Sequence, residues 1–161
     1  MAQTPIAIND DHWKIVGGVV VRGYGVASGQ GAGNPYPDGT IALQKPFFAA
    51  RGLDLAAYMA GTLNISIAPA TFQLLQPAYL FRRVAWTTLH QPEDFSFARC
   101  RLTFSATRYD GWVYYPHPET KERHVQQPSM LELIMPLVPE IGYGDVVQIA
   151  VPTNEILLVD Q

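Results

Sequence analysis

Two side chains that carry neutral oxygens stand two residues apart at the start of a strand-like segment. Thr62 and Asn64 follow Gly61 within MAGTLNISI, residues 59–67, and present a hydroxyl and an amide. Mg²⁺ accepts such ligands when substrate phosphates and water complete its octahedral shell. Both residue types also hydrogen-bond the backbone of turns. The spacing therefore allows either a metal site or a turn cap.

A lone carboxylate lies in the apolar segment SMLELIMP, residues 129–136, between Leu131 and Leu133. If Glu132 faces a pocket, its carboxylate can accept a proton from a substrate hydroxyl. If the segment is an ordinary alternating strand, the same side chain points to solvent. Taken by itself, the segment favours the exposed position, and a catalytic base is the second interpretation.

The segment GGVVVRGYGVASGQG, residues 17–31, joins a β-prone run to a series of glycines. Because glycine lacks a Cβ, the backbone N–H groups around Gly23 and Gly25 can approach a phosphate closely, and Ser28 and Gly29 extend the same loop. The segment matches neither a P-loop nor a complete dinucleotide-binding pattern, and no helix clearly follows it. Phosphate binding and a simple hairpin connection both stay open.

The histidines and the cysteine predict no transition-metal centre. His12 and His90 stand alone, and His117 and His124 lie apart in one charged segment, whereas zinc and iron need a convergent ligand set. The single cysteine, Cys100, lies in the middle of a β-prone segment and is expected to be a buried structural thiol.

Composition limits the partners. The chain has 161 residues, is 48% hydrophobic and carries a formal net charge of −3 at pH 7. We expect a single domain over residues 1–161 with a flexible tail at 1–12. No excess of positive charge draws the chain to nucleic acid or anionic lipid, and the N-terminus has no apolar core behind a basic start. We therefore expect a cytoplasmic protein that has no nucleic-acid or membrane partner.

Short β-prone segments must position these residues. They alternate apolar and polar side chains or are rich in β-branched residues, and Gly and Pro separate them. The turn dipeptide Asp110-Gly111 places the segments before and after it in a hairpin or on neighbouring strands. The predicted strands cover residues 13–21, 63–67, 82–89, 97–106, 111–115, 130–135, 145–151 and 155–159.

Helical signals are few. Residues 54–60 can form one or two turns with Asp54 as N-cap, residues 71–76 are a second candidate, and a single turn fits within 135–142. Residues 29–45 are rich in loop residues. Many short strands with few helices favour a closed barrel or a sandwich. We predict an all-β fold, a compact barrel with one or two short helices.

Taken in order, the motifs resemble those of the CTP-dependent, archaeal-type riboflavin kinases. GVVVRGYG at 18–25, AGTLNISI at 60–67 and LELIMPLVPEIGYGDVVQIAV at 131–151 are similar to the family's three main motifs. YDGWVYYPHPETKERH at 109–124 is similar to the segment that precedes the family's final glutamate strand. The resemblance covers most of the chain, from about Ile15 to Val151.

This resemblance implies a six-stranded Greek-key barrel of the riboflavin-kinase-like, cradle-loop type. It implies transfer of the terminal phosphate of a nucleoside triphosphate, with CTP as the expected donor, to riboflavin to give FMN. Mg²⁺ would be held by Thr62 and Asn64, and Glu132 would be the catalytic base. Nucleotide contacts would come from Gly23, Gly25, Ser28, Gly29 and Gly61, and substrate contacts from Thr120 and His124.

Two other functions remain open. The first is a non-catalytic barrel of the same fold that binds a nucleotide or a flavin. The second is a structural or partner-binding domain that uses the arginine-rich central segments. These segments carry Arg82, Arg83, Arg99, Arg101 and Arg108. Magnesium-dependent binding of CTP separates the kinase from the partner-binding domain, and turnover separates it from the non-catalytic barrel.

Overall fold

The computed structural model describes residues 12–22, 40–89, 91–119 and 128–160. These ranges are mostly β, with strands separated by short connections and one described helix. The elements are β1 (Trp13–Val21), α1 (Ile41–Ala49), β2 (Leu63–Ser66), β3 (Thr71–Leu74), β4 (Tyr79–Val84), β5 (Glu93–Phe104), β6 (Thr107–Pro116), β7 (Met130–Ile134), β8 (Val146–Pro152) and β9 (Ile156–Val159).

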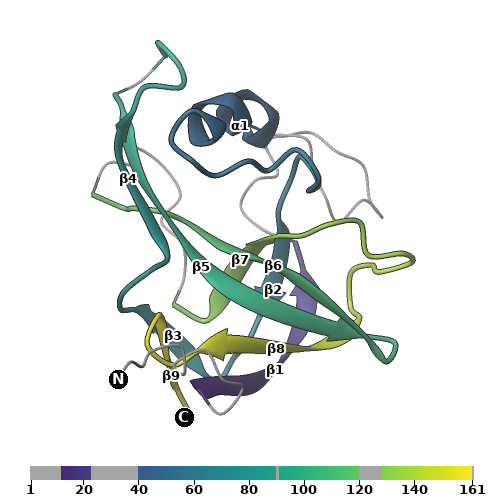
Figure 1. Cartoon of the computed structure of the whole chain (residues 1–161). Helices are drawn as coiled ribbons and strands as arrows, with labels where there is room; N and C mark the ends of the chain where they lie inside the picture. Colours follow the sequence, from purple (N-terminus) through teal and green to yellow (C-terminus); the bar gives the residue numbers. More distant parts are fainter. Residues whose placement is uncertain (1–11, 23–39, 90, 120–127, 161) are drawn as a thin grey trace, which may run out of the picture.

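Six antiparallel strands form a ring in the order β5-β6-β7-β2-β1-β8, and β8 pairs back onto β5 (Figure 1). The closing pairs place Arg101 opposite Ala150 and Thr103 opposite Gln148. The first half of β5 extends beyond this closure and pairs with β4, for example Phe97 with Tyr79. One long strand therefore belongs both to the ring and to the sheet that continues from it.

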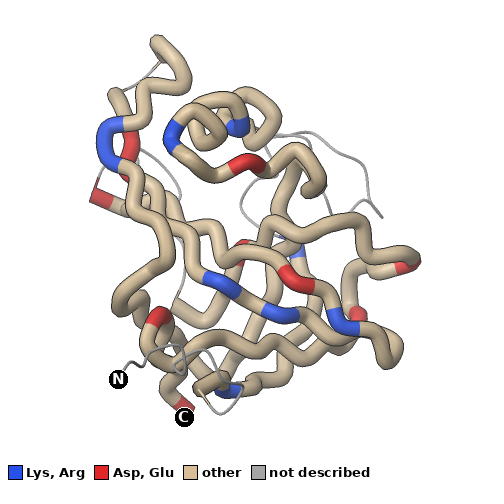
Figure 2. Tube along the Cα trace, viewed as in Figure 1, with Lys and Arg blue, Asp and Glu red and all other residues tan. Residues whose placement is uncertain are grey.

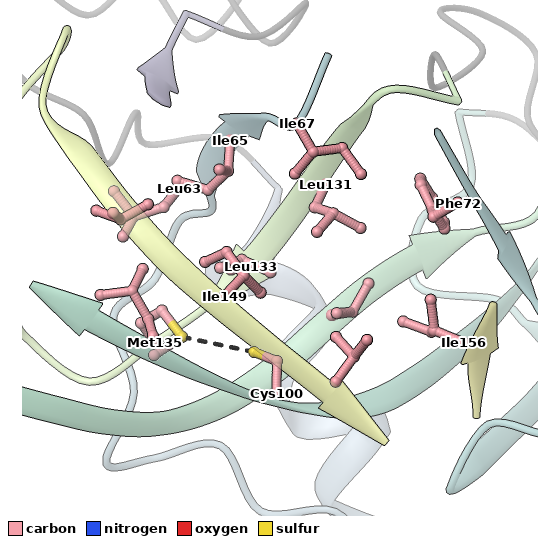
Figure 3. Packing of buried hydrophobic residues seen from close by; sticks show 14 of the residues in the cluster. Leu63, Ile65, Ile67, Phe72, Cys100, Leu131, Leu133, Met135, Ile149 and Ile156 are labelled. Carbon is pink, nitrogen blue, oxygen red and sulfur yellow. Dashed lines mark hydrogen bonds between the residues drawn. The ribbon is translucent and has the colours of Figure 1, made fainter. Parts of the chain in front are cut away.

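Alternation along the strands fills the ring with apolar side chains. On the paired strands β2 and β7, Leu63, Ile65, Leu131 and Leu133 are fully buried in one cluster (Figure 3). Cys100 of β5 belongs to the same cluster, and burial raises the pKa of its thiol. The expectation of a buried structural thiol is confirmed. The residues between the inward-facing ones must point outward, because successive side chains of a strand alternate between its faces.

A two-stranded sheet of β3 and β9 covers one end of the ring. Phe72 and Leu74 of β3 pair with Leu158 and Ile156 of β9. These residues are buried in, or packed against, the interior cluster of the ring. Their burial explains why residues 71–74 form a strand. The helix predicted over 71–76 is wrong, because an apolar run this short has no decisive periodicity and its partner strand lies far away in the sequence.

Helix α1 and strand β4 cover part of the outer surface of the ring and build a second core there. Phe48 of α1 is fully buried, and its ring centroid lies 5.1 Å from that of Phe95 and 4.9 Å from that of Phe97. Ile41, Gln44 and Phe48 are buried at helical spacing, so one face of α1 packs onto the strands.

The position of this helix differs from the prediction. Residues 41–45 were expected in a loop but lie in α1, and the helix accommodates Pro46. Residues 54–60 form turns instead of a helix, and the Asp54 carboxylate accepts a hydrogen bond from the Ala56 N–H at 2.9 Å. The capping residue was recognised, but no helix follows it. A third expected helical turn, within 135–142, is a non-helical turn at Pro139–Glu140.

Most predicted strands are confirmed, but two segments are corrected. Residues 85–89 lie outside β4. Residues 97–104 and 111–115 do lie on neighbouring strands of one hairpin, β5 and β6, but its turn is at Ser105–Ala106 and not at Asp110-Gly111. Both turn residues have positive φ, 54° and 65°, as the tight turns of β-hairpins require. None of the helices in the described part of the chain has the length and apolarity that a membrane span requires.

Gly111 lies inside β6 because β7 and the residue after it approach its backbone closely. A Cβ at this position would meet the Met135 sulfur and would lie 2.7 Å from the Ile134 carbonyl oxygen. We predict that Gly111→Ala lowers the free energy of unfolding by about 1–3 kcal/mol, because a backbone carbonyl cannot rotate away. Urea denaturation measures the change.

Gly17→Ala is the matched control, since a Cβ on Gly17 of β1 would have no neighbour within 4 Å. We expect Gly17→Ala to be neutral or slightly stabilising. Equal stability of the two variants would show that the close approach at Gly111 does not constrain the fold.

Candidate functional site

The structure brings two of the predicted site residues together on the outer face of the ring. Asn64 of β2 lies directly opposite Glu132 of β7 in the antiparallel register. Their neighbours in sequence fill the interior, so both side chains point outward. Directly opposite residues of an antiparallel pair have Cβ atoms about 5 Å apart. The amide and the carboxylate are therefore within reach of one ligand.

Tyr114 of β6 extends this row across a third strand. The β6–β7 register pairs Val113 with Leu133, and one further step places Tyr114 opposite Glu132. Tyr114 is buried, and its burial raises the pKa of its hydroxyl, with the negative charges of Glu132 and Glu93 acting in the same direction. Tyr114 therefore stays protonated and can act only as a neutral hydrogen-bond donor or acceptor.

A buried polar contact attaches α1 to this row. The Tyr114 hydroxyl donates a hydrogen bond to Gln44 Oε1 at 2.7 Å, and Gln44 Nε2 donates to Thr40 Oγ1 at 3.1 Å. Gln44 is 2% exposed, so its amide depends on these two partners. Lys45 of the same helix donates to the Tyr58 carbonyl at 2.6 Å and links α1 to the segment that leads into β2.

The buried Asn64 amide differs from that of Gln44. Asn64 is 5% exposed, and the described residues offer its side chain no hydrogen bond. Thr62 is half-buried just before β2 and likewise has no side-chain hydrogen bond within the described ranges. The turn-cap interpretation of both residues therefore has no support there. A buried amide without a partner costs about 1–3 kcal/mol, which a bound ligand can offset.

The donor chemistry at this point suits a hard cation held mainly by its substrate. Thr62 and Asn64 offer neutral oxygens, and Glu132 lies beside them. Across the described ranges, no three His, Cys, Asp or Glu residues form a group that could hold a metal ion. A divalent ion at Thr62 and Asn64 would therefore take most of its ligands from phosphate and water, which is the usual state of Mg²⁺.

The remaining predicted residues divide into two groups. Gly61 is buried directly before Thr62, and β1 ends at Val21, opposite Asn64. Val21, two residues before Gly23 in the sequence, therefore lies beside Asn64. The other predicted contact residues lie outside the described residues, as does most of the predicted tail at 1–12. They are Gly23, Gly25, Ser28, Gly29, Thr120 and His124.

His117 belongs to a separate polar cluster that the sequence did not indicate. Its Nε2 lies 2.7 Å from the Ser96 hydroxyl oxygen, and its Nδ1 lies 3.5 Å from a carboxylate oxygen of Glu119. These residues and Tyr115 line a pocket of about 450 Å³ beside β3. Tyr114 and Tyr115 are consecutive and point to opposite sides of β6, so this pocket and the Asn64–Glu132 row do not share a surface.

Sequence reasoning missed Tyr114, Gln44 and Lys45 as parts of the site. Tyr114 lies among other aromatic residues in the sequence, so its type alone does not single it out. Gln44 and Lys45 fall in the loop-rich segment 29–45, whose composition does not predict helix α1. Tyr114 can be recognised as part of the site only when the pairing of β6 with β7 is known.

Comparisons with known proteins add no family assignment. No protein-family model matches the chain, and no curated protein gives a significant match.

The Tyr114–Gln44 contact predicts a measurable stability difference. Tyr114→Phe should lower the free energy of unfolding by about 1–3 kcal/mol, because it leaves the buried Gln44 oxygen without its donor. Tyr109→Phe is the matched control, since Tyr109 of the same strand has no side-chain hydrogen bond among the described residues. Chemical denaturation of both variants tests this prediction. A loss of the same size in each would show that the hydroxyl of Tyr114 contributes nothing specific.

Proposed function

We propose that the protein is a riboflavin kinase-like phosphotransferase that transfers the terminal phosphate of a nucleoside triphosphate, with CTP as the expected donor, to riboflavin. The observation that carries the proposal is the pairing of Glu132 with Asn64, whose buried amide lacks a partner among the described residues. The order of the three motifs supports the same function. The closed ring of six antiparallel strands supports a Greek-key barrel of the riboflavin-kinase-like type.

The proposed reaction makes few demands on the protein. The ribityl hydroxyl oxygen attacks the γ-phosphorus, its proton passes to the Glu132 carboxylate, and the bond between the γ-phosphorus and the β–γ bridging oxygen breaks. The products are FMN and a nucleoside diphosphate. Phosphoryl transfer is accelerated chiefly by positioning the acceptor and neutralising charge on the transferred group. Glu132 is half-buried on a strand that is paired on both sides, which fixes the position of its backbone and the face of the sheet from which its side chain extends.

The roles of Thr62 and Asn64 follow from their oxygens. Both would contact Mg²⁺, which supplies charge neutralisation on the triphosphate when bound. Gly61, directly before them, lets the nucleotide approach the backbone. Gly23, Gly25, Ser28 and Gly29 are proposed phosphate contacts, and Thr120 and His124 proposed acceptor contacts, on the basis of the motif resemblance.

The direct test is formation of FMN. The purified protein is mixed with riboflavin, Mg²⁺ and, separately, CTP, ATP or GTP, and the flavins are separated by chromatography. We expect FMN with CTP. If the folded protein forms no FMN with any donor but binds nucleotide or flavin, the non-catalytic barrel replaces the kinase.

Glu132→Gln separates catalysis from binding. We expect turnover to fall by at least ~100-fold, because the amide cannot accept the hydroxyl proton, while affinity for CTP stays nearly unchanged. Asp160→Asn is the control, since it makes the same carboxylate-to-amide change at an exposed residue that follows β9 and pairs with Lys14. Wild-type turnover in Glu132→Gln would show that Glu132 is not the catalytic base.

Asn64→Leu tests the metal role with a readout that does not need activity. The variant replaces a buried amide that lacks a partner by an apolar group of similar size. We therefore expect the protein without ligands to become equally or more stable, while Mg²⁺-dependent CTP binding weakens at least about tenfold. Calorimetry and thermal denaturation measure the two effects. Asn154→Ala, in an exposed turn, should change neither. A clear loss of stability with unchanged CTP binding would show that Asn64 has a structural role and does not contact the metal.

A further inference from the structure

A hollow of about 240 Å³ lies on the outer face of the ring, away from α1, where β1, β8 and β5 run side by side. The registers align Ile15 with Ala150 and Ala150 with Arg101, and two residues further along they align Gln148 with Thr103. Figure 2 shows basic segments in succession along β5 and β6, with an acidic segment beside them. This surface includes part of the arginine-rich region that the proposed kinase function does not use.

Arg101 is held in place before any ligand arrives. Its guanidinium carbon lies 3.9 Å from the centre of the Trp13 ring, and its Nε lies 3.8 Å from a carboxylate oxygen of Asp110. The side chain is only 23% exposed. Stacking on Trp13 fixes the plane of the guanidinium, so little side-chain entropy remains to be lost when an anion binds.

Arg108 supplies a second cation to the same hollow. Arg108 lies opposite Thr103 in the β5–β6 register and is exposed, and the described residues offer it no ion pair. Thr103 and Gln148 add neutral hydrogen-bonding groups to the lining. Two guanidinium groups can donate hydrogen bonds to a single oxyanion, and the Asp110 carboxylate lies beside Arg101.

The rest of the lining is apolar. Ile15 is 61% exposed, which is unusual for a large aliphatic side chain in the centre of a sheet, and Trp13 is only half-buried. An apolar floor beside two guanidinium groups fits a ligand with an apolar ring and an attached anion. Inorganic ions alone would leave Ile15 and Trp13 in contact with water.

We propose that this hollow is a binding site for a small aromatic oxyanion, a carboxylate or a phosphate ester, with Arg101 and Arg108 contacting the anion and Trp13 and Ile15 contacting the ring. The site shares no residue with the Asn64–Glu132 row and goes beyond the proposed kinase function. Its test is therefore independent of whether FMN is formed.

Benzoate and phenyl phosphate are the probes, and benzyl alcohol is the neutral control. Each is titrated into isotopically labelled protein at about physiological ionic strength, and the backbone signals of Thr103 and Gln148 and the indole signal of Trp13 are followed by NMR. We expect saturable shifts confined to the hollow with at least one of the two anions. Saturation by benzoate alone would show that the hollow binds carboxylates, and saturation by phenyl phosphate alone would show that it binds phosphate esters.

Arg108→Ala should weaken this binding at least about tenfold, because it removes a charged hydrogen-bond donor. Arg101→Lys keeps the charge but loses the flat guanidinium, and we expect a comparable loss. Arg82→Ala, at an exposed arginine of β4, is the matched control and should leave binding unchanged. Equal weakening in Arg82→Ala, saturation by benzyl alcohol at the same concentration, or no saturable shift with either anion would overturn the proposal.

Discussion

The pairing of β5 with β8 is the contact on which the rest of the structure depends, because it closes the sheet into a ring. Once the ring is closed, every strand has an interior and an exterior face, and alternation assigns each side chain to one of them. An ion pair with a buried carboxylate supports the same junction. Glu155, 2% exposed between β8 and β9, accepts hydrogen bonds from the backbone N–H and the guanidinium Nε of Arg99 on β5 at 2.8 and 2.7 Å.

The outer surface of the ring has three regions that differ in how they are covered and in whether their polar groups are hydrogen-bonded. Helix α1 and β4 cover one region with a second apolar core and satisfy its buried polar groups through Tyr114 and Gln44. Next to it, the Asn64 amide is buried without a partner among the described residues. Around β1, β8 and the second half of β5, the surface stays open and combines arginines with exposed apolar side chains. Proteins that fill their cores this well retain such exceptions mainly where they bind something.

The proposed kinase chemistry fits a scaffold of this kind. The register of β2 and β7 holds Asn64 and Glu132 opposite each other, so their side chains extend from fixed backbone positions on one face of the sheet. Phosphoryl transfer benefits more from such fixed positions than from reactive side chains. Tyr114 remains neutral next to Glu132 because burial, and with it the negative charges of Glu132 and Glu93, raises the pKa of its hydroxyl.

Local sequence by itself determined most of the strands of the ring, the inward and outward side chains of β2 and β7, and the buried state of Cys100. These follow from period-two alternation, which is written in neighbouring residues. Tertiary structure decided the rest. Residues 41–49 form a helix because their apolar face packs on β5, and residues 71–74 form a strand because β9 lies beside them. Gly111 marks a close approach of Met135 and not a turn. The sequence singled out Asn64 and Glu132 separately, but only the β2–β7 register placed them opposite each other, because strand pairing joins residues that are 68 positions apart by contacts no local pattern contains.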